Sequence, residues 1–370
     1  MKKRLVLIGG GHAHMVTLAN LGKITEKGHT VTVIGPSDHH YYSGMGPGML
    51  SGTYRPDEVR FATRHVVEKQ GGTFLPGKAA RIDPEKKTVI LENGDAVPYD
   101  VLSCNAGSYV PQPAIDGDLD DIFTVKPIER LMEAKSRLID HFARHITDVV
   151  IVGGGPSAAE VAGNVWQLAT TTGGHMPRIT VCAGRAFMSR FPESVRRRIV
   201  ETLGRRGISV REGVYAKSVS LGSVTLDNGD TLPADFIFLA LGVTPSAIFS
   251  DSGIATGPDG GLRVNRFLQS TQHPDIFGGG DCIYFEDQPL DKVGVYAVRQ
   301  NPVLLHNITA RLDGGDLMPF DPGGDYLLIF NLGGRVGVLK KRWLEFGGRA
   351  AFIAKDYIDR KFMKEFQAIE

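Results

Sequence analysis

The sequence predicts an α/β protein built from two nucleotide-binding units of the Rossmann type, because one pattern occurs in it twice. Residues 92–107, ENGDAVPYDVLSCNAG, recur in pattern at residues 227–242 as DNGDTLPADFIFLALG. Each copy lies downstream of its own glycine-rich segment, VLIGGGHAH at 6–14 and VVIVGGGPSAAE at 149–160. Two units of this kind predict two bound nucleotides.

The first unit begins with a glycine-rich turn after an apolar run. Leu5–Ile8 has the composition of a buried parallel strand, and Gly9 would allow the tight turn that follows it. Gly11 would let the backbone approach a pyrophosphate, whose charge meets the amide end of the helix that we expect from His12. His14 stands where the fingerprint normally has a small third residue, which weakens the match.

The second unit matches the fingerprint more closely. A strand is expected at Val149–Val152, and Gly153 and Gly155 follow it. Ala158 supplies the small third residue, and the helix is expected to continue through Glu160.

Both units lack the acidic residue that usually binds a ribose hydroxyl after the second strand. In the first unit the expected strand Val31–Ile34 is followed by Gly35, and Asp38 is the nearest substitute. In the second unit the expected strand Ile179–Cys182 is followed within three residues by Arg185. An arginine here can accommodate the 2′-phosphate of NADP, so the sequence favours NADPH or leaves the choice between NADPH and NADH open.

Length and composition exclude several classes of protein. The chain has 370 residues, is 42% hydrophobic and carries a formal net charge of +1, so it offers no global field for nucleic acid. No apolar run approaches the roughly 20 residues of a membrane-spanning helix. Lys2–Ile8 passes directly into a strand and leaves no room for a signal peptide. We therefore expect a cytoplasmic protein, or one held only at a membrane surface.

The cysteines and the first histidines do not indicate a metal site. Cys104, Cys182 and Cys282 are widely separated, which argues against a disulfide scaffold and a structural zinc site. We expect them to be buried and unreactive. His12 and His14 resemble a metal-binding pair, but a phosphate-binding turn is a poor place for a cation.

Residues 270–281, STQHPDIFGGGD, resemble the second flavin motif of the pyridine nucleotide-disulfide oxidoreductase superfamily. In that motif a strand ends in Gly-Asp, and the aspartate binds the ribityl chain of FAD. Tyr99–Gly107 and Asp235–Pro245 resemble the strands of the same superfamily that end in Ala-Thr-Gly. The resemblance covers nearly the whole chain, with five motifs in the family's order. It implies FAD in the first unit and NADPH or NADH in the second.

Within the superfamily the chain looks closest to type II NADH:quinone oxidoreductases, sulfide:quinone reductases and the flavoprotein module fused to selenide, water dikinase. The features that carry this likeness are the GGGHAH loop, Tyr41–Gly48, Val293–Gln300 and the tail Gly348–Phe366. The first long helix is expected over His12–Lys27, and it has no cysteine pair such as disulfide reductases place against the flavin.

The fingerprints and the resemblance together nominate the site residues. For FAD these are Gly9, Gly11, His12, Ala13, Pro47, Gly107, Gly280, Asp281 and Val295, and for the nicotinamide nucleotide Gly153, Gly155, Pro156, Ser157, Arg185 and Gly242. The resemblance places Pro47 beside the isoalloxazine ring and the helix N-terminus at Val295 near the flavin C2 carbonyl. It also nominates Gln300 for the quinone pocket, Glu160 for positioning or proton supply, and Lys126 for the flavin edge. Each of these last three also fits an ordinary structural or solvent-facing role.

The order of the motifs implies two Rossmann-like, doubly wound domains, with the nicotinamide domain inserted into the flavin domain. We expect the FAD domain at 1–115 and 255–320, the NAD(P) domain at 116–254 and a small C-terminal segment at 321–370. Two joints rich in proline or glycine support these seams, Tyr109–Pro113 and Gly257–Gly261.

The tail differs in character from the rest of the chain. Phe352–Phe366 alternates large apolar side chains with cations that include Lys355, Arg360, Lys361 and Lys364. This pattern is typical of an amphipathic basic helix at an anionic bilayer surface, and it also fits a C-terminal helix packed against the flavin domain.

The function implied by the resemblance is transfer of electrons from NAD(P)H through FAD to a quinone or another small acceptor. A sulfide:quinone oxidoreductase is the first alternative, although neither Gly153–Gly163 nor residues 283–370 contain the cysteine that such enzymes use. The second alternative is a non-catalytic flavin-binding interaction protein. The acceptor and the oligomeric state, including a homodimer, are left open.

Overall fold

The computed structural model describes residues 2–111, 115–116, 122–220 and 222–370. Its first unit is built on a parallel sheet in the order β22–β9–β1–β2–β5. These strands are β1 (Arg4–Ile8), β2 (Thr30–Gly35), β5 (Thr73–Pro76), β9 (Val101–Cys104) and β22 (Ile276–Gly278). The chain leaves β1 toward β2 on one side and later adds β9 and β22 on the other, which creates the switch point where doubly wound sheets bind ligands.

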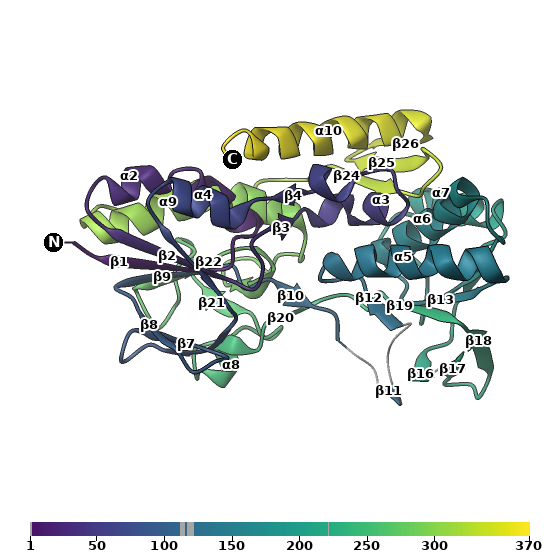
Figure 1. The fold of residues 1–370 in the computed structure, drawn as a ribbon, viewed down its shortest axis with the longest axis horizontal. Coiled ribbons are helices and arrows are strands. Elements are labelled where there is room, and N and C mark those ends of the chain that lie inside the picture. The colour runs from purple at the N-terminus through teal and green to yellow at the C-terminus, as the bar shows by residue number, and fades with distance from the viewer. Residues whose placement is uncertain (1, 112–114, 117–121, 221) are drawn as a thin grey trace.

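The second unit repeats this sheet with the same arrangement. Its order is β12–β19–β13–β14–β15, and all five strands are parallel. They are β12 (Ile122–Thr124), β13 (Asp148–Val152), β14 (Arg178–Cys182), β15 (Ser209–Arg211) and β19 (Phe236–Leu239). Figure 1 shows the two sheets next to each other, and the predicted fold class is therefore confirmed.

The recurring sequence pattern forms the same hairpin in both units. In the first unit Asn93 Nδ2 donates to Asp95 at 2.8 Å, and the Asp95 amide donates back at 3.0 Å. In the second unit Asn228 and Asp230 make the same two bonds, both at 3.0 Å. The first hairpin belongs to an antiparallel sheet of β6 (Ala79–Asp83), β7 (Thr88–Leu91) and β8 (Ala96–Pro98). The second belongs to a sheet of β11 (Ile115–Asp116), β16 (Ala216–Ser220), β17 (Gly222–Leu226) and β18 (Thr231–Ala234), in which β11 pairs with β16 in parallel and the other pairs are antiparallel.

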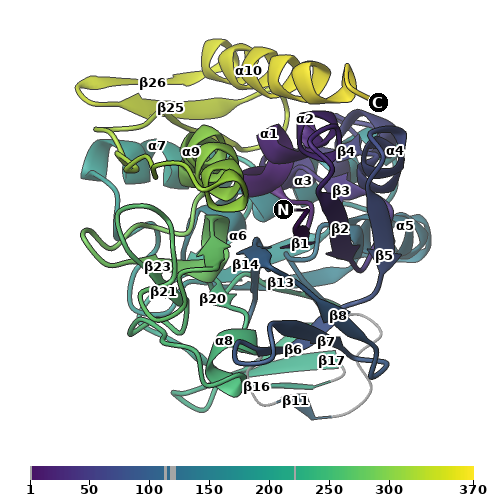
Figure 2. The ribbon, with the colours of Figure 1, turned by 90° about the vertical axis from the view of Figure 1, so that its left-hand side faces the viewer.

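Most helices lie on one side of the two parallel sheets, and the strands β6–β8 and β16–β18 lie on the other side, where the short helix α8 (Ile248–Asp251) contacts β6 (Figure 2). The helices are α1 (Met15–Leu18), α2 (Leu21–Thr25), α3 (Gly46–Leu50), α4 (Thr63–Lys69), α5 (Glu129–Arg144), α6 (Pro156–Thr172), α7 (Glu193–Gly204), α8 (Ile248–Asp251), α9 (Gly294–Asp313) and α10 (Arg349–Gln367). Short 3₁₀ turns occur at η1 (His12–His14), η2 (Ser43–Met45), η3 (Pro56–Glu58) and η4 (Gly280–Cys282). None of the helices in the described ranges is long and apolar enough to cross a membrane.

The prediction of one long helix over His12–Lys27 is wrong, because the structure divides this stretch into η1, α1 and α2. The break lies at Asn20, whose side-chain amide donates to the Val16 carbonyl at 2.8 Å. An asparagine that bonds the backbone locally competes with the helical pattern.

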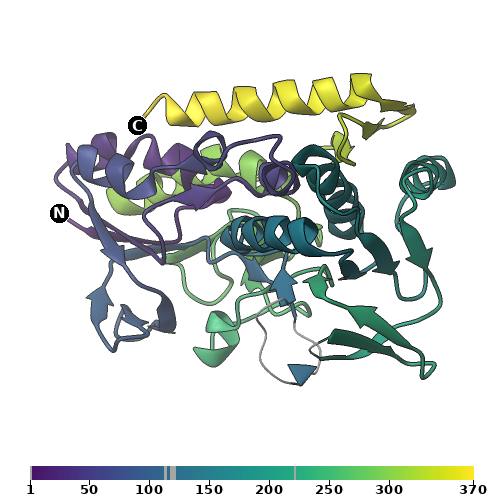
Figure 3. The same cartoon turned by 45° about the vertical axis from the view of Figure 1, so that its right-hand side comes forward.

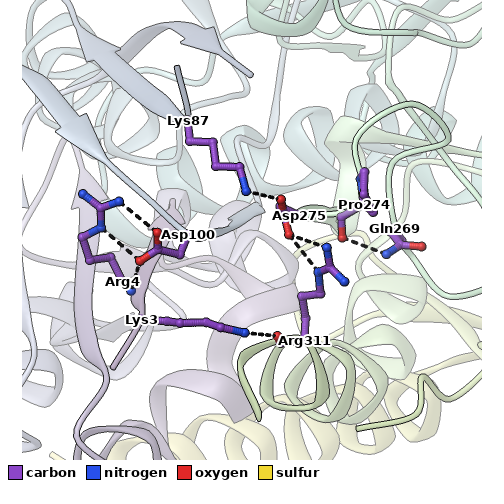
Figure 4. A network of polar contacts seen from close by, with 8 residues as sticks. All are labelled: Lys3, Arg4, Lys87, Asp100, Gln269, Pro274, Asp275 and Arg311. Carbon is purple, nitrogen blue, oxygen red and sulfur yellow. Dashed lines mark hydrogen bonds and ion pairs between the residues drawn. The ribbon is translucent and has the colours of Figure 1, made fainter. Parts of the chain in front are cut away.

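Asp275 fastens the late strand β22 to the rest of the first unit. Its carboxylate binds Lys87 Nζ at 2.5 Å and the Arg311 guanidinium at 2.7 Å (Figure 4). Lys87 precedes β7 and Arg311 lies in α9. The half-buried carboxylate of Asp275 therefore joins three parts of the chain that are distant in sequence. Between the units, β10 (Ser108–Tyr109) pairs with β20 (Thr244–Pro245). This pair lies near the first predicted domain boundary, Tyr109–Pro113. Residues 112–113 of that boundary lie outside the described ranges.

The C-terminal segment packs across both units (Figure 3). Its sheet consists of β24 (Leu328–Asn331), β25 (Gly337–Lys341) and β26 (Leu344–Gly348), and α10 follows it. The remaining short strands are β3 (His40–Tyr41), β4 (Arg60–Phe61), β21 (Leu262–Val264) and β23 (Ile283–Phe285). The turn after β24 touches α6 so closely that a Cβ on Gly163 would lie 2.0 Å from the Leu332 carbonyl oxygen.

Replacement of Gly163 by alanine should therefore destabilise the protein, although alanine is the better helix former. The new methyl group meets backbone that cannot move without undocking the C-terminal sheet, and overpacking of this kind costs about 1–3 kcal/mol. Gly204→Ala, in open space at the end of α7, is the matched control and should cause no loss. Denaturant unfolding of both variants measures the effect, and an unchanged midpoint for Gly163→Ala would show that the contact is not tight.

Candidate functional site

A single large cleft of about 1940 Å³ connects the two units at the carboxyl ends of their sheets. Ligand pockets usually enclose about 300–1,000 Å³, so this cleft has room for more than one nucleotide. Fifteen of the predicted site residues line it: Gly9, Gly11, His12, Pro47, Gly107, Lys126, Gly153, Gly155, Pro156, Ser157, Glu160, Arg185, Gly242, Gly280 and Asp281. Ala13, Val295 and Gln300 do not line it, although Val293 and Gly294 at the start of α9 do.

The same backbone contact shapes the glycine turn of each unit. Gly9 has φ +83°, and a Cβ there would lie 2.3 Å from the Asn105 carbonyl oxygen at the end of β9. Gly153 has φ +144°, and its Cβ would lie 2.1 Å from the Ala240 carbonyl oxygen at the end of β19. Only glycine fits such a contact, so these two residues bring the turns against the neighbouring strands and keep the cleft open to a ligand.

His14 stands at the position of the usual third glycine, and its side chain does not line the cleft. Its Nδ1 lies 2.7 Å from the Gly9 carbonyl oxygen and its Nε2 lies 2.8 Å from Ser103 Oγ. Burial lowers the pKa of His14 to about 4, so the ring is neutral. The side chain therefore links β1 to β9 instead of filling the space of a bound pyrophosphate.

Beside the first glycine turn, the cleft presents polar atoms that suit the phosphate and polyol parts of FAD. Asn105 Nδ2 is buried without a hydrogen-bond partner, and it would lie 2.9 Å from a Cβ on Gly11. His12 and His40 pack edge to face, and burial lowers the pKa of both, to about 4 and about 3. An orphaned amide donor next to a glycine turn fits an oxygen-rich ligand.

Asp281 carries a charge at the floor of the cleft. Its Oδ2 binds Lys126 Nζ at 2.7 Å and accepts a bond from Ser108 Oγ at 2.8 Å. Burial would raise the pKa of Asp281, but the Lys126 ammonium and the two hydrogen bonds bring it below its ordinary value. Gly280, the preceding residue, is bound to α9, because its amide donates to Gln300 Oε1 at 2.7 Å.

These contacts change the interpretation of two nominated residues. Gln300 is buried under the Gly280 turn, so it supports the turn and does not face the cleft. Lys126 does face the cleft, and its charge is shared with Asp281. Both positions were nominated from the resemblance, which gives no information about such partners.

The second glycine turn and an exposed arginine line the same part of the cleft. Gly155 is the extended cap of α6, and Pro156 begins the helix, whose first amides open on the cleft. Arg185 is exposed at the cleft edge. The nearby carboxylate of Glu212 is occupied by the Phe187 amide at 2.6 Å and by Arg196 at 2.8 Å.

In the first unit Asp38 does not act as the substitute for the missing ribose acid. It is an exposed residue that pairs with Arg64 at 3.3 Å, and it is absent from the lining of the cleft. The neighbours Ser37 and His39 line the cleft instead.

Glu160 lies between the cleft and the C-terminal segment. The Asn331 amide donates to Glu160 Oε1 at 2.7 Å, and burial raises the pKa of Glu160 to about 7. Lys355, which also lines the cleft, donates to Asp359 Oδ2 at 2.8 Å and to the Gly44 carbonyl at 2.9 Å.

The assignment of Lys355 to a lipid-facing surface is therefore wrong. Only 8% of the residue is exposed, and it lies on the same buried face of α10 as Phe352 and Met363. The spacing Phe352, Lys355, Asp359, Phe362, Phe366 alternates steps of three and four residues, and this spacing could have marked the buried stripe.

The three cysteines are buried and unpaired, as predicted. Burial raises the pKa of Cys282 and of Cys182 to about 11, and that of Cys104 well above its ordinary value. None of the three is a thiolate at neutral pH. Within the described ranges, no group of three or more histidine, cysteine or carboxylate side chains could hold a metal ion.

Two dinucleotide-binding turns that open on one cleft define a two-nucleotide oxidoreductase. The chain belongs to the pyridine nucleotide-disulphide oxidoreductase family, whose model matches residues 3–307. This membership confirms, at the level of the family, the expected pair of cofactors, FAD and a nicotinamide nucleotide.

Individual relatives cover most of the chain. It is 24% identical to demethylphylloquinone reductase NdbB of Synechocystis sp., over 96% of this chain and 90% of that protein. It is 23% identical to a type II NADH:quinone oxidoreductase of Staphylococcus saprophyticus, over 96% and 94%. The solved sulfide:quinone oxidoreductase of Aquifex aeolicus has the same fold, with a TM-score of 0.82, 19% identity, and coverage of 100% and 92%.

Replacement of Asp281 by alanine should lower the FAD content of the purified protein. The change leaves ribityl hydroxyls without an acceptor, at a cost of about 1–3 kcal/mol, and it also leaves Lys126 unpaired. The ratio of flavin absorbance to protein, measured at limiting free FAD, reports the effect. Asp38→Ala, outside the cleft, is the control. Full occupancy in Asp281→Ala would remove this residue from the flavin site.

Proposed function

We propose that this protein is an FAD-dependent NAD(P)H:quinone oxidoreductase. The observation that carries the proposal is the shared cleft, which is lined by both glycine turns and by the half-buried carboxyl group of Glu160, with a pKa of about 7. Two relatives, a demethylphylloquinone reductase and a type II NADH:quinone oxidoreductase, support a quinone as the acceptor.

FAD in the first unit would take a hydride from NAD(P)H and pass two electrons to the acceptor. The chain's own groups orient the two nucleotides and manage charge and protons. Asp281 and Lys126 hold opposite charges near the ribityl position, and the N-terminus of α9 directs free amides toward the cleft from Gly294. We retain the proposed division into an FAD domain at 1–115 and 255–320, an NAD(P) domain at 116–254 and a C-terminal segment at 321–370.

Glu160 is the group best suited to supply a proton. Reduction of a quinone by NAD(P)H takes up one proton, because the donor supplies a hydride and the hydroquinone carries two added hydrogens. A buried carboxyl with a pKa of about 7 is protonated in part of the molecules at neutral pH and can release its proton. Its Oε1 accepts the Asn331 amide, so the proton belongs on Oε2.

The thiols support a nicotinamide donor over sulfide. Sulfide oxidation of the expected kind needs a reactive cysteine near the flavin, and all three cysteines here are buried with raised pKa values. Anaerobic stopped-flow mixing with NADH, NADPH and sulfide separately tests the proposal. Rapid bleaching by a nicotinamide, reversed by a quinone, is expected. Bleaching by sulfide alone would favour the alternative enzyme, and no bleaching at all would favour a flavin-binding interaction protein.

We further propose a preference for NADPH. Arg185 is exposed at the nucleotide cleft, and the carboxylate of Glu212 is already bound to Arg196. Arg185→Glu should therefore raise the dissociation constant of NADPH more than that of NADH. Arg197→Glu, an exposed arginine of α7 outside the cleft, is the matched control. Equal effects of Arg185→Glu on both nucleotides would place the 2′-phosphate elsewhere.

We propose that α10 contacts a membrane surface through its outer face. Ile353 and Tyr357 are 57% and 67% exposed, and Trp343 in the preceding turn is 88% exposed. Lys361 and Lys364 are exposed on the same helix. Such apolar side chains gain about 1.5–3 kcal/mol each on burial, so together with the cations they suit an anionic lipid surface.

The double variant Ile353→Ser, Tyr357→Ser should abolish flotation with anionic liposomes and slow a long-tailed quinone. It should keep FAD and the reaction with a short-chain quinone, because neither side chain contributes to the buried face of α10. The matched control is Ile146→Ser, Met176→Ser, at two exposed apolar positions outside the C-terminal segment. Unchanged flotation of the first variant would exclude this face as the lipid contact.

A further inference from the structure

Lys355, a buried lysine of α10, forms its ion pair with a carboxylate other than Glu160. Lys355 Nζ donates to Asp359 Oδ2 at 2.8 Å and to the Gly44 carbonyl at 2.9 Å. Tyr42 OH donates to the other oxygen of Asp359 at 3.2 Å. Among the described residues, no hydrogen bond or ion pair joins Lys355 to Glu160, although both line the cleft.

We propose that Asp359, held by Tyr42, neutralises Lys355 and so allows Glu160 to keep a proton in the cleft at neutral pH. Asp359 is thus a positioning residue that acts through Lys355. The proposal rests on the proposed function, since a proton on Glu160 is useful only if an acceptor takes it up. The step itself is simple: the O–H bond of Glu160 breaks, a bond from that proton to the reduced acceptor forms, and Glu160 is protonated again from water.

The charge count within the cluster supports this role. With Glu160 protonated, the ammonium of Lys355 and the carboxylate of Asp359 cancel, and the buried cluster is neutral. Without Asp359, the ammonium would be left without a counter-ion, and ionisation of Glu160 would restore neutrality. An opposite charge within about 4–6 Å lowers the pKa of an acid by about 1–3 units, so the identity of the partner of Lys355 decides the state of Glu160.

The remaining charged groups around the cluster do not replace Asp359. Asp356 lies one turn away and pairs with Arg360 at 2.9 Å, and Arg360 also binds Glu58 at 2.6 Å. Tyr54 packs under Arg360, and its raised pKa keeps it neutral. The carboxylates that act on Lys355 are therefore Asp359 and, more weakly, Glu160.

The causes of the pKa shifts of Lys355, Asp359 and Glu160 agree with the pairing of Lys355 with Asp359. Burial would lower the pKa of Lys355, but Asp359 and then Glu160 raise it above its ordinary value. Burial raises the pKa of Asp359, and the Lys355 and Tyr42 hydrogen bonds oppose that shift. Burial raises the pKa of Glu160 to about 7, while Lys355 acts in the opposite direction.

Infrared difference titration of the holoprotein, recorded without any nicotinamide or quinone, tests the proposal. The carbonyl stretch of protonated Glu160 is assigned by its loss in Glu160→Gln. Asp359→Asn should lower the midpoint of this band by about one to three pH units, and Lys355→Gln should raise it. Asp356→Asn, which removes a carboxylate from the same helix without touching Lys355, should leave it unchanged. An unchanged or raised midpoint in Asp359→Asn would overturn the proposal.

A weaker variant and a kinetic measurement complete the test. Tyr42→Phe removes one hydrogen bond from Asp359 and should lower the midpoint by a smaller amount, so it serves if Asp359→Asn does not fold. In stopped flow, Asp359→Asn should move the pH profile of the acceptor half-reaction to lower pH and leave the nicotinamide half-reaction in place. If no quinone reacts but the infrared shifts occur, the proposed function fails and the Asp359 assignment stands. If quinone reacts but the band does not shift, only the Asp359 assignment fails.

Discussion

The site depends on one backbone contact that the chain makes twice. A strand carbonyl, Asn105 in the first unit and Ala240 in the second, occupies the space where Gly9 or Gly153 would carry a side chain. Each contact pulls a glycine turn against the end of the neighbouring strand, and the first amides of the following helix then face the carboxyl edge of the sheet. Because both sheets present this edge to the same cleft, two nucleotides can meet there.

Features that follow from short-range geometry could be predicted from the sequence. The glycine turns and the strands around them appear where the sequence places them, within about two residues. They could be predicted because an apolar run followed by a glycine-rich turn is a local pattern, although each turn also closes against the carbonyl of a strand far along the chain. The broken first helix was missed because it depends on how Asn20 bonds its own backbone, and a hydrophobic pattern does not record that choice.

Features that depend on partners far along the chain could not be predicted in the same way. His14 fits the crowded turn only because Ser103, almost ninety residues later in sequence, accepts or donates a hydrogen bond at its Nε2. Gln300 was placed in the acceptor pocket by likeness to relatives, but its amide oxygen holds the Gly280 turn. The ammonium of Lys126 likewise has a partner far along the chain, the carboxylate of Asp281. In each case the residue type was informative, and the role was set by a distant partner.

The helix α10 shows how one element can link the chemistry of the cleft to the surroundings of the molecule. Its inner face carries Lys355 and Asp359 to within reach of Glu160 and packs Phe362 on the His12 ring beside the first glycine turn. Its C-terminal end is fixed to the first unit, since Gln367 donates to the Arg60 carbonyl at 2.9 Å. The helix therefore cannot leave the cleft without disturbing the flavin side of the site. Whatever binds the exposed face at Ile353 and Tyr357 is thereby held on the opposite side of the helix from Lys355, whose pairing we propose controls the proton of Glu160.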